Sequence, residues 1–452
     1  LADSANHRIR RVDASTGVAT TVAGTGESGF TGDGGPGPSA LLSFPQSVAV
    51  DAQGNVYIAD TGNGRIRRVD AVTGIIRTIA GTGTFGFSGD GGPASEAEFG
   101  EIVALVTGGG GKLFVSDGVD EQFQGNHRVR AIDLATGLVS TVAGNGDFSF
   151  SGDGGPATEA GLTTEGIAVD PEGNLYVADF NNFRIRRVDA VTGIITTVAG
   201  KGPLFGGGGG YSGEGGPATD AQMNLPYGVA VDAQGNLYIA DTGNSRIRVV
   251  EATTGNIVTV AGIGVPAEGG DGGPAMLAGL DVPARLVLDP DGNLIIADIF
   301  NNRIRRLNAP QTRLPLLELP ASQVDFQTVS IGEGSSRGLS IENLGNLAFT
   351  IQQATVDNQD FAVQTELPLS VGPLQTSELI VQFTPRAEGL TEGQLVLATS
   401  DPNNPTVTIL LQGKGAAPDI GVVPTELVFR RTFIGTETSL SLTVSNLGAG
   451  IL

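Results

Sequence analysis

The sequence predicts an all-β protein that combines a ring of small four-stranded units with a β-sandwich. Four short motifs recur through residues 1–308, and a second, longer repeat follows in the C-terminal part. No segment carries a sustained apolar period of 3.6 residues, so the pattern does not favour amphipathic helices. Repetition at a fixed spacing defines the fold class more strongly than any single segment does.

The clearest repeat places an Asp shortly before an Arg-Ile-Arg-like strand. The Asp stands at positions 3, 60, 117, 179, 241 and 298, in steps of 57, 57, 62, 62 and 57 residues. Within a unit, turns such as Asp51-Ala52-Gln53-Gly54 separate short β-branched runs, as Asp and Gly do in type I turns. In the second unit these runs are Val48–Val50, Val56–Ala59, Arg65–Val69 and Ile75–Ala80. Four-stranded units repeated about six times predict a β-propeller.

The stretch Gly54–Arg67 and its five relatives resemble the NHL-repeat family. The resemblance implies a six-bladed propeller around a central channel, here over residues 1–308. A long Gly-Asp-Gly-Gly insertion in each unit departs from the family. Both chain ends fall inside repeat units, so we expect a truncated N-terminus. The missing fourth strand of the sixth unit is expected from residues upstream of Leu1, not from Arg313–Leu319.

The second repeat predicts immunoglobulin-like domains. Phe326, Ile331 and Asn343 recur 103 residues later, and alternating strands lie between them. With no Cys and no Trp, these are not antibody-type domains. The pattern resembles Hydin-type (ASH, choice-of-anchor D) domains. We therefore expect a linker at 309–317, a complete Ig-like domain at 318–415, and the start of a second, truncated one at 416–452.

Composition excludes several classes of function. A net charge of −22 opposes nucleic-acid or anionic-membrane partners, which need a basic surface. No apolar run approaches the length of a membrane helix. Zero Cys excludes thiol catalysis and Cys-ligated metals. The two histidines, His7 and His127, share a slot that other units fill with Gly or Phe, so neither is predicted to be a catalytic base.

Five acidic residues in the Gly-Asp-Gly-Gly loops form one candidate ligand-binding set. They could bind cations or repel polyanions, or they could accept hydrogen bonds within their own turns. The Arg-Ile-Arg motif likewise allows polyanion binding, or pairing with the Asp five residues earlier or with a strand-end acid such as Asp70. We favour the structural interpretation for both. The acidic set is Asp33, Asp90, Asp153, Glu214 and Asp271.

The third unit carries six extra residues between its second and third strands. They bring Asp120, Glu121 and Phe123, an aromatic between polar groups, to the face that holds the long loops. With Glu165 and Tyr227 near the channel mouth, they form the predicted contact patch. The alternative is that this unit has drifted and carries no function.

These observations favour a non-catalytic binding or scaffold protein. Its loop-rich propeller face would recognise a protein or a carbohydrate, and the Ig-like domains would act as spacers. The alternative is an enzyme, because propellers similar to NHL include metal-dependent gluconolactonases and streptogramin lyases. Their metal is held by carboxylates or His of the innermost strands. The corresponding slot here is Gln46, Val103, Glu165, Tyr227 and Ala284.

One carboxylate among five residues does not make a metal cage, so no catalytic residue, metal or cofactor is predicted. Ca²⁺ in the acidic loops is not predicted either, because Glu214 replaces Asp in one copy and the Asp-x-Asp-x-Asp-Gly pattern is missing. Acidic, Gly-rich propellers joined to Hydin-type repeats look like exported bacterial proteins. We therefore expect an extracellular, periplasmic or cell-surface location.

Overall fold

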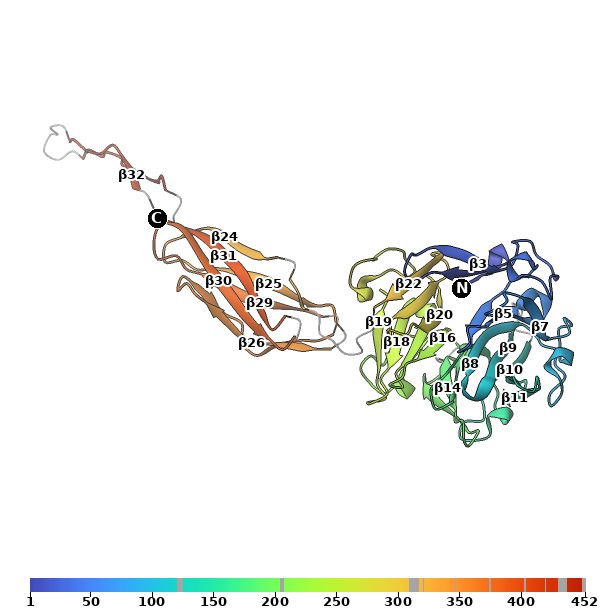
Figure 1. Ribbon diagram of the computed structural model, residues 1–452. Coiled ribbons are helices and arrows are strands. Elements are labelled where there is room, and N and C mark those ends of the chain that lie inside the picture. The colour runs from blue at the N-terminus through green and yellow to red at the C-terminus, as the bar shows by residue number, and fades with distance from the viewer. Residues whose placement is uncertain are drawn as a thin grey trace. The chain divides into compact units, whose positions relative to one another are not determined.

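The computed structural model describes residues 1–119, 125–203, 207–308, 317–319, 321–345, 347–373, 375–401, 404–418, 420–429 and 437–448. The chain divides into two compact units, Leu1–Thr312 and Arg313–Leu452 (Figure 1). Each unit has hydrophobic cores of its own. No helix in the described part of the chain is long and apolar enough to cross a membrane.

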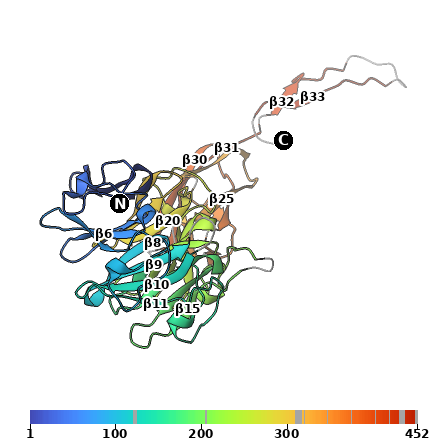
Figure 2. The same ribbon diagram turned by 90° about the vertical axis from the view of Figure 1, so that its right-hand side faces the viewer.

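The first unit is a β-propeller made of six antiparallel sheets in chain order, which we call blades 1 to 6. Blades 2 to 5 have four strands each, and Figure 2 shows those of blade 3 side by side. Blades 1 and 6 have three strands each among the described residues. The strands are β1 (Ala2–Asp3), β2 (Arg8–Val12) and β3 (Ala19–Ala23); β4 (Ser47–Val50), β5 (Val56–Asp60), β6 (Arg65–Val69) and β7 (Ile76–Ala80); β8 (Ile102–Gly108), β9 (Lys112–Val119), β10 (Gly125–Asp133) and β11 (Val139–Ala143); β12 (Thr164–Val169), β13 (Leu175–Asp179), β14 (Arg184–Val188) and β15 (Ile195–Ala199); β16 (Pro226–Val231), β17 (Leu237–Asp241), β18 (Arg246–Val250) and β19 (Ile257–Ala261); β20 (Pro283–Leu288), β21 (Leu294–Asp298) and β22 (Arg303–Leu307).

The first strand of each blade from 2 to 6 lies innermost. Strand β4 packs beside β8, β8 beside β12, β12 beside β16, and β16 beside β20. Apolar clusters fill the space between consecutive blades, as Ile66, Phe99 and Val115 do between blades 2 and 3. Both faces of a blade are therefore covered by neighbouring blades. For this reason the second strand β5 does not alternate between apolar and polar residues, and it is buried at four of its five positions.

In the described part of the chain, ten short 3-10 turns connect the strands. One group follows the second strands, and another follows the Gly-Asp-Gly-Gly loops, where Pro fixes the first turn. The turns are η1 (Ser4–Asn6), η2 (Gly37–Ser39), η3 (Thr61–Asn63), η4 (Ala94–Glu96), η5 (Gly109–Gly111), η6 (Ala157–Glu159), η7 (Phe180–Asn182), η8 (Ala218–Asp220), η9 (Thr242–Asn244) and η10 (Ala275–Leu277).

Each Gly-Asp-Gly-Gly loop that precedes blades 2 to 5 covers the outer edge of the blade it leads into. In blade 2, the N–H of Gly34 donates to the carbonyl of Ile76, and the N–H of Ile76 donates to the carbonyl of Gly35. The same pair of bonds recurs at β11, β15 and β19. An exposed strand edge is a template for unwanted pairing, and the loop blocks it.

The second unit contains a β-sandwich of two sheets, ordered β23-β25-β29-β27 and β24-β31-β30-β26-β28. Strands β24 and β31 are parallel, and the other pairs are antiparallel. Phe326, Phe361 and Phe383 pack together in the core between the sheets. The strands are β23 (Leu317–Glu318), β24 (Gln323–Ser330), β25 (Ser335–Asn343), β26 (Phe349–Val356), β27 (Phe361–Val363), β28 (Leu369–Val371), β29 (Thr376–Phe383), β30 (Gly389–Thr399) and β31 (Thr406–Ala416).

The observed sandwich limits differ slightly from the predicted ones. Leu317, predicted as linker, already belongs to β23, and β31 ends at Ala416 instead of residue 415. Strand β23 pairs with Glu342 and Asn343 of β25, so this part of 313–319 is not a fourth strand for blade 6. Beyond the sandwich, β32 (Ile420–Val423) and β33 (Thr443–Asn446) form a two-stranded sheet.

Candidate functional site

The five loop carboxylates each pair with the third residue of an Arg-Ile-Arg-like motif in the next blade. We call these the anchor arginines. In blade 2, Asp33 accepts hydrogen bonds from Arg67 and from the backbone N–H of Thr78 on the fourth strand. These bonds lower the pKa of Asp33, although its partial burial opposes the change. The closest contacts are Arg67–Asp33 2.7 Å, Arg130–Asp90 2.8 Å, Arg186–Asp153 2.6 Å, Arg248–Glu214 3.6 Å and Arg305–Asp271 2.5 Å.

The loop acids thus bond to the following blade, whereas the sequence favoured bonds within their own turns. The sequence interpretation missed this because the partners lie 34 residues apart, as Asp33 and Arg67 do. Each acid already has a cationic partner that holds its loop in place. A role for these five acids in ligand binding stays a prediction.

The anchor arginines also pair with the Asp that ends the second strand. Arg67 and Asp60 lie 3.2 Å apart, and both side chains are fully buried. Burial raises the pKa of the equivalent Asp117, Asp179 and Asp241 to about 6, although each neighbouring Arg opposes this. A buried charge needs such a partner to remain in the interior.

The predicted pairing of the Asp with the Arg five residues later is therefore wrong. Asp60 and Arg65 are opposite each other in the strand register, but the ion pair goes to Arg67. The guanidinium of Arg65 instead lies 4.1 Å from the ring centroid of Phe30, in the long loop, and donates to backbone carbonyls. The predicted pairing of Arg68 with Asp70 is confirmed at 3.1 Å.

Two of the predicted contact residues, Glu165 and Tyr227, do come together, on neighbouring innermost strands. Each is the second residue of an innermost strand, β12 and β16, so both lie where the long loops enter the blades. Tyr227 acts to lower the pKa of Glu165, so the two side chains interact. Asp120, Glu121 and Phe123, the other members of the predicted patch, lie outside the described residues.

Arg285, which the sequence reasoning missed, completes this group. It lies on β20, and its Nη2 donates to the carbonyl of Val103 on β8 at 2.7 Å. The same Nη2 lies 3.7 Å from Oε2 of Glu165, and the guanidinium carbon lies 4.6 Å from the Tyr227 ring centroid. Arg285 therefore links the innermost strands of blades 3, 4, 5 and 6.

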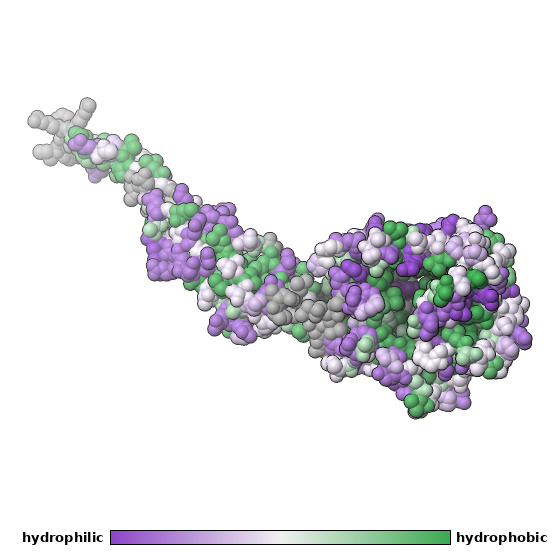
Figure 3. Space-filling model, viewed as in Figure 1, coloured by the Kyte–Doolittle hydropathy of each residue, from purple (hydrophilic) through white to green (hydrophobic). Residues whose placement is uncertain are grey.

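Two further polar side chains lie beside this group, just before β4 and β8. Nε2 of Gln46 donates to Oε1 of Glu101 at 2.5 Å, and Glu101 acts electrostatically on both Glu165 and Tyr227. We call the whole set the mouth cluster. Figure 3 shows the propeller surface hollowed near its centre. The mouth cluster consists of Gln46, Glu101, Glu165, Tyr227 and Arg285.

The electrostatics of the mouth cluster depart from those of exposed side chains. Glu165 is only 5% exposed, and burial raises its pKa to about 7, against the opposing effects of Arg285 and Tyr227. Burial likewise raises the pKa of Tyr227 to about 12. A carboxyl that changes charge near neutral pH beside a specific charged partner is a typical feature of functional sites.

Two buried polar atoms in the mouth cluster have no hydrogen-bond partner in the part of the chain that the structure describes. They are Oε2 of Glu165 and Nη1 of Arg285. One accepts hydrogen bonds and the other donates them, and such groups are usually satisfied when buried. The ring of Tyr227, with Phe180 at 5.6 Å, offers an apolar surface beside them.

A sequence signal for Arg285 exists in the aligned repeats. Its column reads Ser47, Ala104, Gly166, Gly228 and Arg285, in steps of 57, 62, 62 and 57 residues. Small residues fit here because the innermost strands approach closely: a Cβ on Gly166 would lie 2.5 Å from the carbonyl oxygen of Tyr227. Arg285 is the one large, charged residue at a repeat position that the other blades fill with small residues, and this difference is the sequence signal for it.

The described residues contain no group of three or more His, Asp or Glu side chains placed to hold a metal ion. The mouth cluster contributes two carboxylates, and Arg285 lies beside one of them. Its side chains offer both hydrogen-bond donors and acceptors.

Comparison with known proteins identifies both parts of the chain. The NHL repeat family matches residues 42–69, 165–188 and 223–250. The ASH family (Abnormal spindle-like microcephaly-assoc'd, ASPM-SPD-2-Hydin) matches residues 315–407. The first match covers parts of blades 2, 4 and 5, and the second covers most of the sandwich.

Among curated relatives, protein SUPPRESSOR OF QUENCHING 1, chloroplastic, from Arabidopsis thaliana is 29% identical over 292 residues. The match covers 64% of this chain and 27% of that protein. NHL repeat-containing protein 2 from Gallus gallus is 24% identical over 453 residues, covering 95% of this chain and 59% of that protein. The chain therefore spans only part of the length of both relatives.

Among solved structures, an auxiliary nutrient binding protein from Bacteroides thetaiotaomicron matches with a TM-score of 0.46 and 18% identity. The match covers 67% of this chain and 64% of that one. A streptogramin B lyase matches with a TM-score of 0.36 and 12% identity, over 81% of this chain and 93% of that one. Similarity at this level gives no information on function. The chain carries NHL repeats in its β-propeller and an ASH domain in its β-sandwich.

Proposed function

We propose that this protein is a non-catalytic binding or scaffold protein whose propeller takes a protein or carbohydrate ligand at the mouth cluster. One observation carries the proposal. The buried acceptor of Glu165 and the buried donor of Arg285 lie side by side without a hydrogen-bond partner among the described residues. A ligand that offers both a donor and an acceptor, such as a sugar hydroxyl pair or a peptide amide, satisfies both atoms.

The aromatic part of the mouth cluster supports the same class of ligand. Tyr227 presents a ring and a hydroxyl, and it is held between Arg285 and Phe180. Aromatic and Arg side chains carry much of the binding energy in protein interfaces. Pockets for small polar ligands similarly combine apolar walls with a few fixed polar groups. The sandwich then acts as a spacer that carries the propeller.

The test is a ligand screen followed by matched variants. The protein is screened against an oligosaccharide array and a displayed peptide library, and the best binder is titrated by calorimetry. We expect Glu165→Gln and Arg285→Met to weaken that binder at least tenfold. Glu172→Gln is the control, because Glu172 is exposed in the turn at the other end of β12. If Glu165→Gln and Arg285→Met both bind this ligand as tightly as the unchanged protein does, the proposal is wrong.

The absence of catalysis is part of the proposal and has its own test. A propeller lactonase or lyase of the metal-dependent kind needs a divalent ion in its channel. Elemental analysis of the purified protein should therefore find no stoichiometric metal. About one Ca²⁺ or Zn²⁺ per chain would favour the enzyme instead.

We also propose an extracellular, periplasmic or cell-surface location, on the basis of the acidic, Gly-rich composition and the resemblance to exported bacterial proteins. Fractionation of cells that express the complete gene with a C-terminal tag tests this. Recovery of the tagged protein in the cytoplasm alone would contradict it.

A further inference from the structure

The aromatic side chains that the described part of the propeller exposes all lie at one end of its blades. They stand in the loops that lead into the first strands or in the turns between second and third strands. These loops and turns meet because a first strand begins where its antiparallel partner ends, as Ser47 and Ala59 show in blade 2. Exposed apolar groups that gather on one face mark an interaction site. The exposed aromatic residues are Phe30, Phe44, Phe85, Phe87, Phe148, Phe150, Tyr211 and Phe300.

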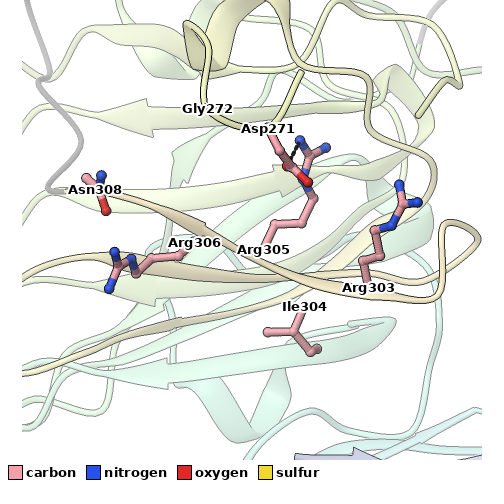
Figure 4. Close-up of a pocket in the computed structure, with 7 residues that line it drawn as sticks. All are labelled: Asp271, Gly272, Arg303, Ile304, Arg305, Arg306 and Asn308. Atoms are coloured by element: carbon pink, nitrogen blue, oxygen red, sulfur yellow. Dashed lines mark hydrogen bonds and ion pairs between the residues drawn. The ribbon is translucent and has the colours of Figure 1, made fainter. Parts of the chain in front are cut away.

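One of these aromatic positions helps to hold its loop in place. It lies three residues before the loop acid, and its ring packs on an arginine of the blade, as Phe87 does on Arg128. In blade 6, Glu268 takes this position, yet the loop acid Asp271 still pairs with Arg305 (Figure 4). An aromatic ring is therefore not required to attach the loop.

A second aromatic, two residues earlier, occurs in the loops that lead into blades 3 and 4. These residues are Phe85 and Phe148, and the equivalents in blades 2 and 5 are Ser28 and Gly209. The two rings are 58% and 62% exposed, so neither contributes much to the core. We call the four aromatic residues of these two loops the phenylalanine patch. The phenylalanine patch consists of Phe85, Phe87, Phe148 and Phe150.

The two loops of the phenylalanine patch are held next to each other by the start of β10. The guanidinium carbon of Arg128 lies 3.9 Å from the ring centroid of Phe87, and its Nη2 donates to the carbonyl of Asn145 in the second loop at 2.6 Å. The ring centroids of His127 and Phe148 lie 6.0 Å apart. A surface that is fixed in advance loses less conformational freedom when a partner binds.

The charges around the phenylalanine patch have one sign. The two loops, 81–101 and 144–163, contain Asp and Glu but no Lys, Arg or His. Asp147 directly precedes one ring, and Oε2 of Glu98 lies 2.9 Å from the position that a Cβ on Gly86 would take, between two others. Unlike the loop acids that hold anchor arginines, these two acids form no ion pair with Arg or Lys among the described residues.

This chemistry fits a polypeptide better than a sugar. All four aromatic residues are Phe, which lacks the hydroxyl or N–H with which Tyr and Trp bind polar ligands. Aromatic side chains that pack against apolar groups are enriched in protein interfaces. The two acids without a basic partner attract a polypeptide of positive charge and repel an acidic one.

We propose that the phenylalanine patch is a docking surface for a polypeptide segment that combines Lys or Arg with apolar side chains. The apolar side chains pack against the four rings, and the cationic groups lie beside Glu98 and Asp147. The rings add cation–π contacts with the same cations. The phenylalanine patch shares no residue with the mouth cluster, so this binding does not depend on the proposed function.

The first test is a selection from random dodecapeptides displayed on phage. The library is selected on the 452-residue chain and, in parallel, on the double variant Phe85→Ser/Phe148→Ser. We expect peptides that are enriched on the parent alone to combine Lys or Arg with Leu, Ile, Phe or Trp. The double variant keeps its fold because both rings are largely exposed and backbone bonds remain, such as that from Thr163 Oγ1 to the carbonyl of Phe148. An unchanged melting temperature checks this.

The most enriched peptide is then labelled and titrated by fluorescence anisotropy. The double variant Phe85→Ser/Phe148→Ser should weaken its binding by about tenfold or more, because aromatic anchors carry much of the binding energy. Phe300→Ser is the matched control and should leave binding unchanged, since Phe300 is an exposed Phe between β21 and β22 of blade 6. Glu98→Gln combined with Asp147→Asn should also weaken binding, with a smaller loss at high salt.

Several results would overturn the proposal. One is a selection that enriches no peptide on the parent over the double variant, and another is enrichment of peptides without Lys or Arg. A labelled peptide that the double variant binds as tightly as the parent would also contradict it. Binding of an oligosaccharide that is lost in the double variant would assign the phenylalanine patch to a carbohydrate and overturn the proposal as well.

Discussion

At the scale of single residues, Glu165 couples the candidate site to pH. Burial raises its pKa from the ordinary 4.5 to about 7. Between these two pH values the folded protein keeps a proton that the unfolded chain has lost. The free energy of unfolding therefore falls as pH rises from 4.5 to 7, and it changes no further above that range.

Glu165→Gln should remove this pH dependence, because Gln does not titrate and Arg285 keeps its bond to the carbonyl of Val103. Relative to the parent, the variant should gain on the order of 2–3 kcal/mol of stability between pH 4.5 and pH 7.5. Urea denaturation at both pH values measures this difference. A stability difference that stays constant with pH, or that favours the parent at high pH, would contradict the raised pKa.

The anchor arginines give a second test at the residue scale. Arg186 is fully buried between Asp153 and Asp179, whereas the next residue, Arg187, pairs at the surface with Asp189. Arg186→Met leaves Asp179 buried without its cation, so we expect a loss of about 3–5 kcal/mol. Arg187→Met is the matched control and should cost less than about 1 kcal/mol. Similar losses for the two variants in thermal unfolding would show that burial of the pair is unimportant.

At the scale of elements, the Gly-Asp-Gly-Gly loops serve as edge covers for the blades. Asp153 ties its loop to Arg186 and to the N–H of Thr197 in the fourth strand, whereas Asp271 has no such strand to hold among the described residues. Replacing each Asp by Ala therefore allows a comparison. The difference in stability loss between the two variants reports the hydrogen bond to the fourth strand, because both variants lose a carboxylate.

Asp153→Ala should destabilise the propeller by about 1–3 kcal/mol and speed amide exchange at Thr197. Asp271→Ala should have the smaller effect on stability, because it loses only a more exposed ion pair. Hydrogen exchange followed by mass spectrometry measures the change in local stability in each variant. Equal destabilisation by the two variants would mean that the loops do not stabilise the fourth strands.

At the scale of the whole molecule, the two units have separate cores. The sandwich core, which includes Ile341, Phe383 and Leu397, contains no propeller residue. A domain with its own apolar core can fold alone. Fragment 313–418 should therefore fold without the propeller and melt in a single transition at the temperature of the sandwich transition in the full chain. A fragment that lacks a cooperative transition by calorimetry would show that the sandwich depends on the propeller.

The repeat pattern determined much of the fold in advance. Local apolar runs and turn residues, which act over a few positions, predicted the strands of blades 2 to 5. They also predicted the tight turns between these strands and the start of the sandwich. Glu165 and Tyr227 were found for the same reason, because both occupy one repeated slot of the innermost strands. The repeat also predicted Arg68–Asp70, a pair only two residues apart.

Contacts between distant residues were decided only by the tertiary structure. The partner of Arg67 is Asp33, 34 residues away, and the acceptor of Arg285 is Val103, 182 residues away. Local sequence carries no signal for such pairs, because they depend on how one blade packs beside the next. Local sequence patterns predicted which strands form and how they repeat. The packing of one blade against the next determines which charged side chains are buried together. At the innermost strands, the close approach of the backbones leaves room for Arg285 only because its neighbours in the repeat are small.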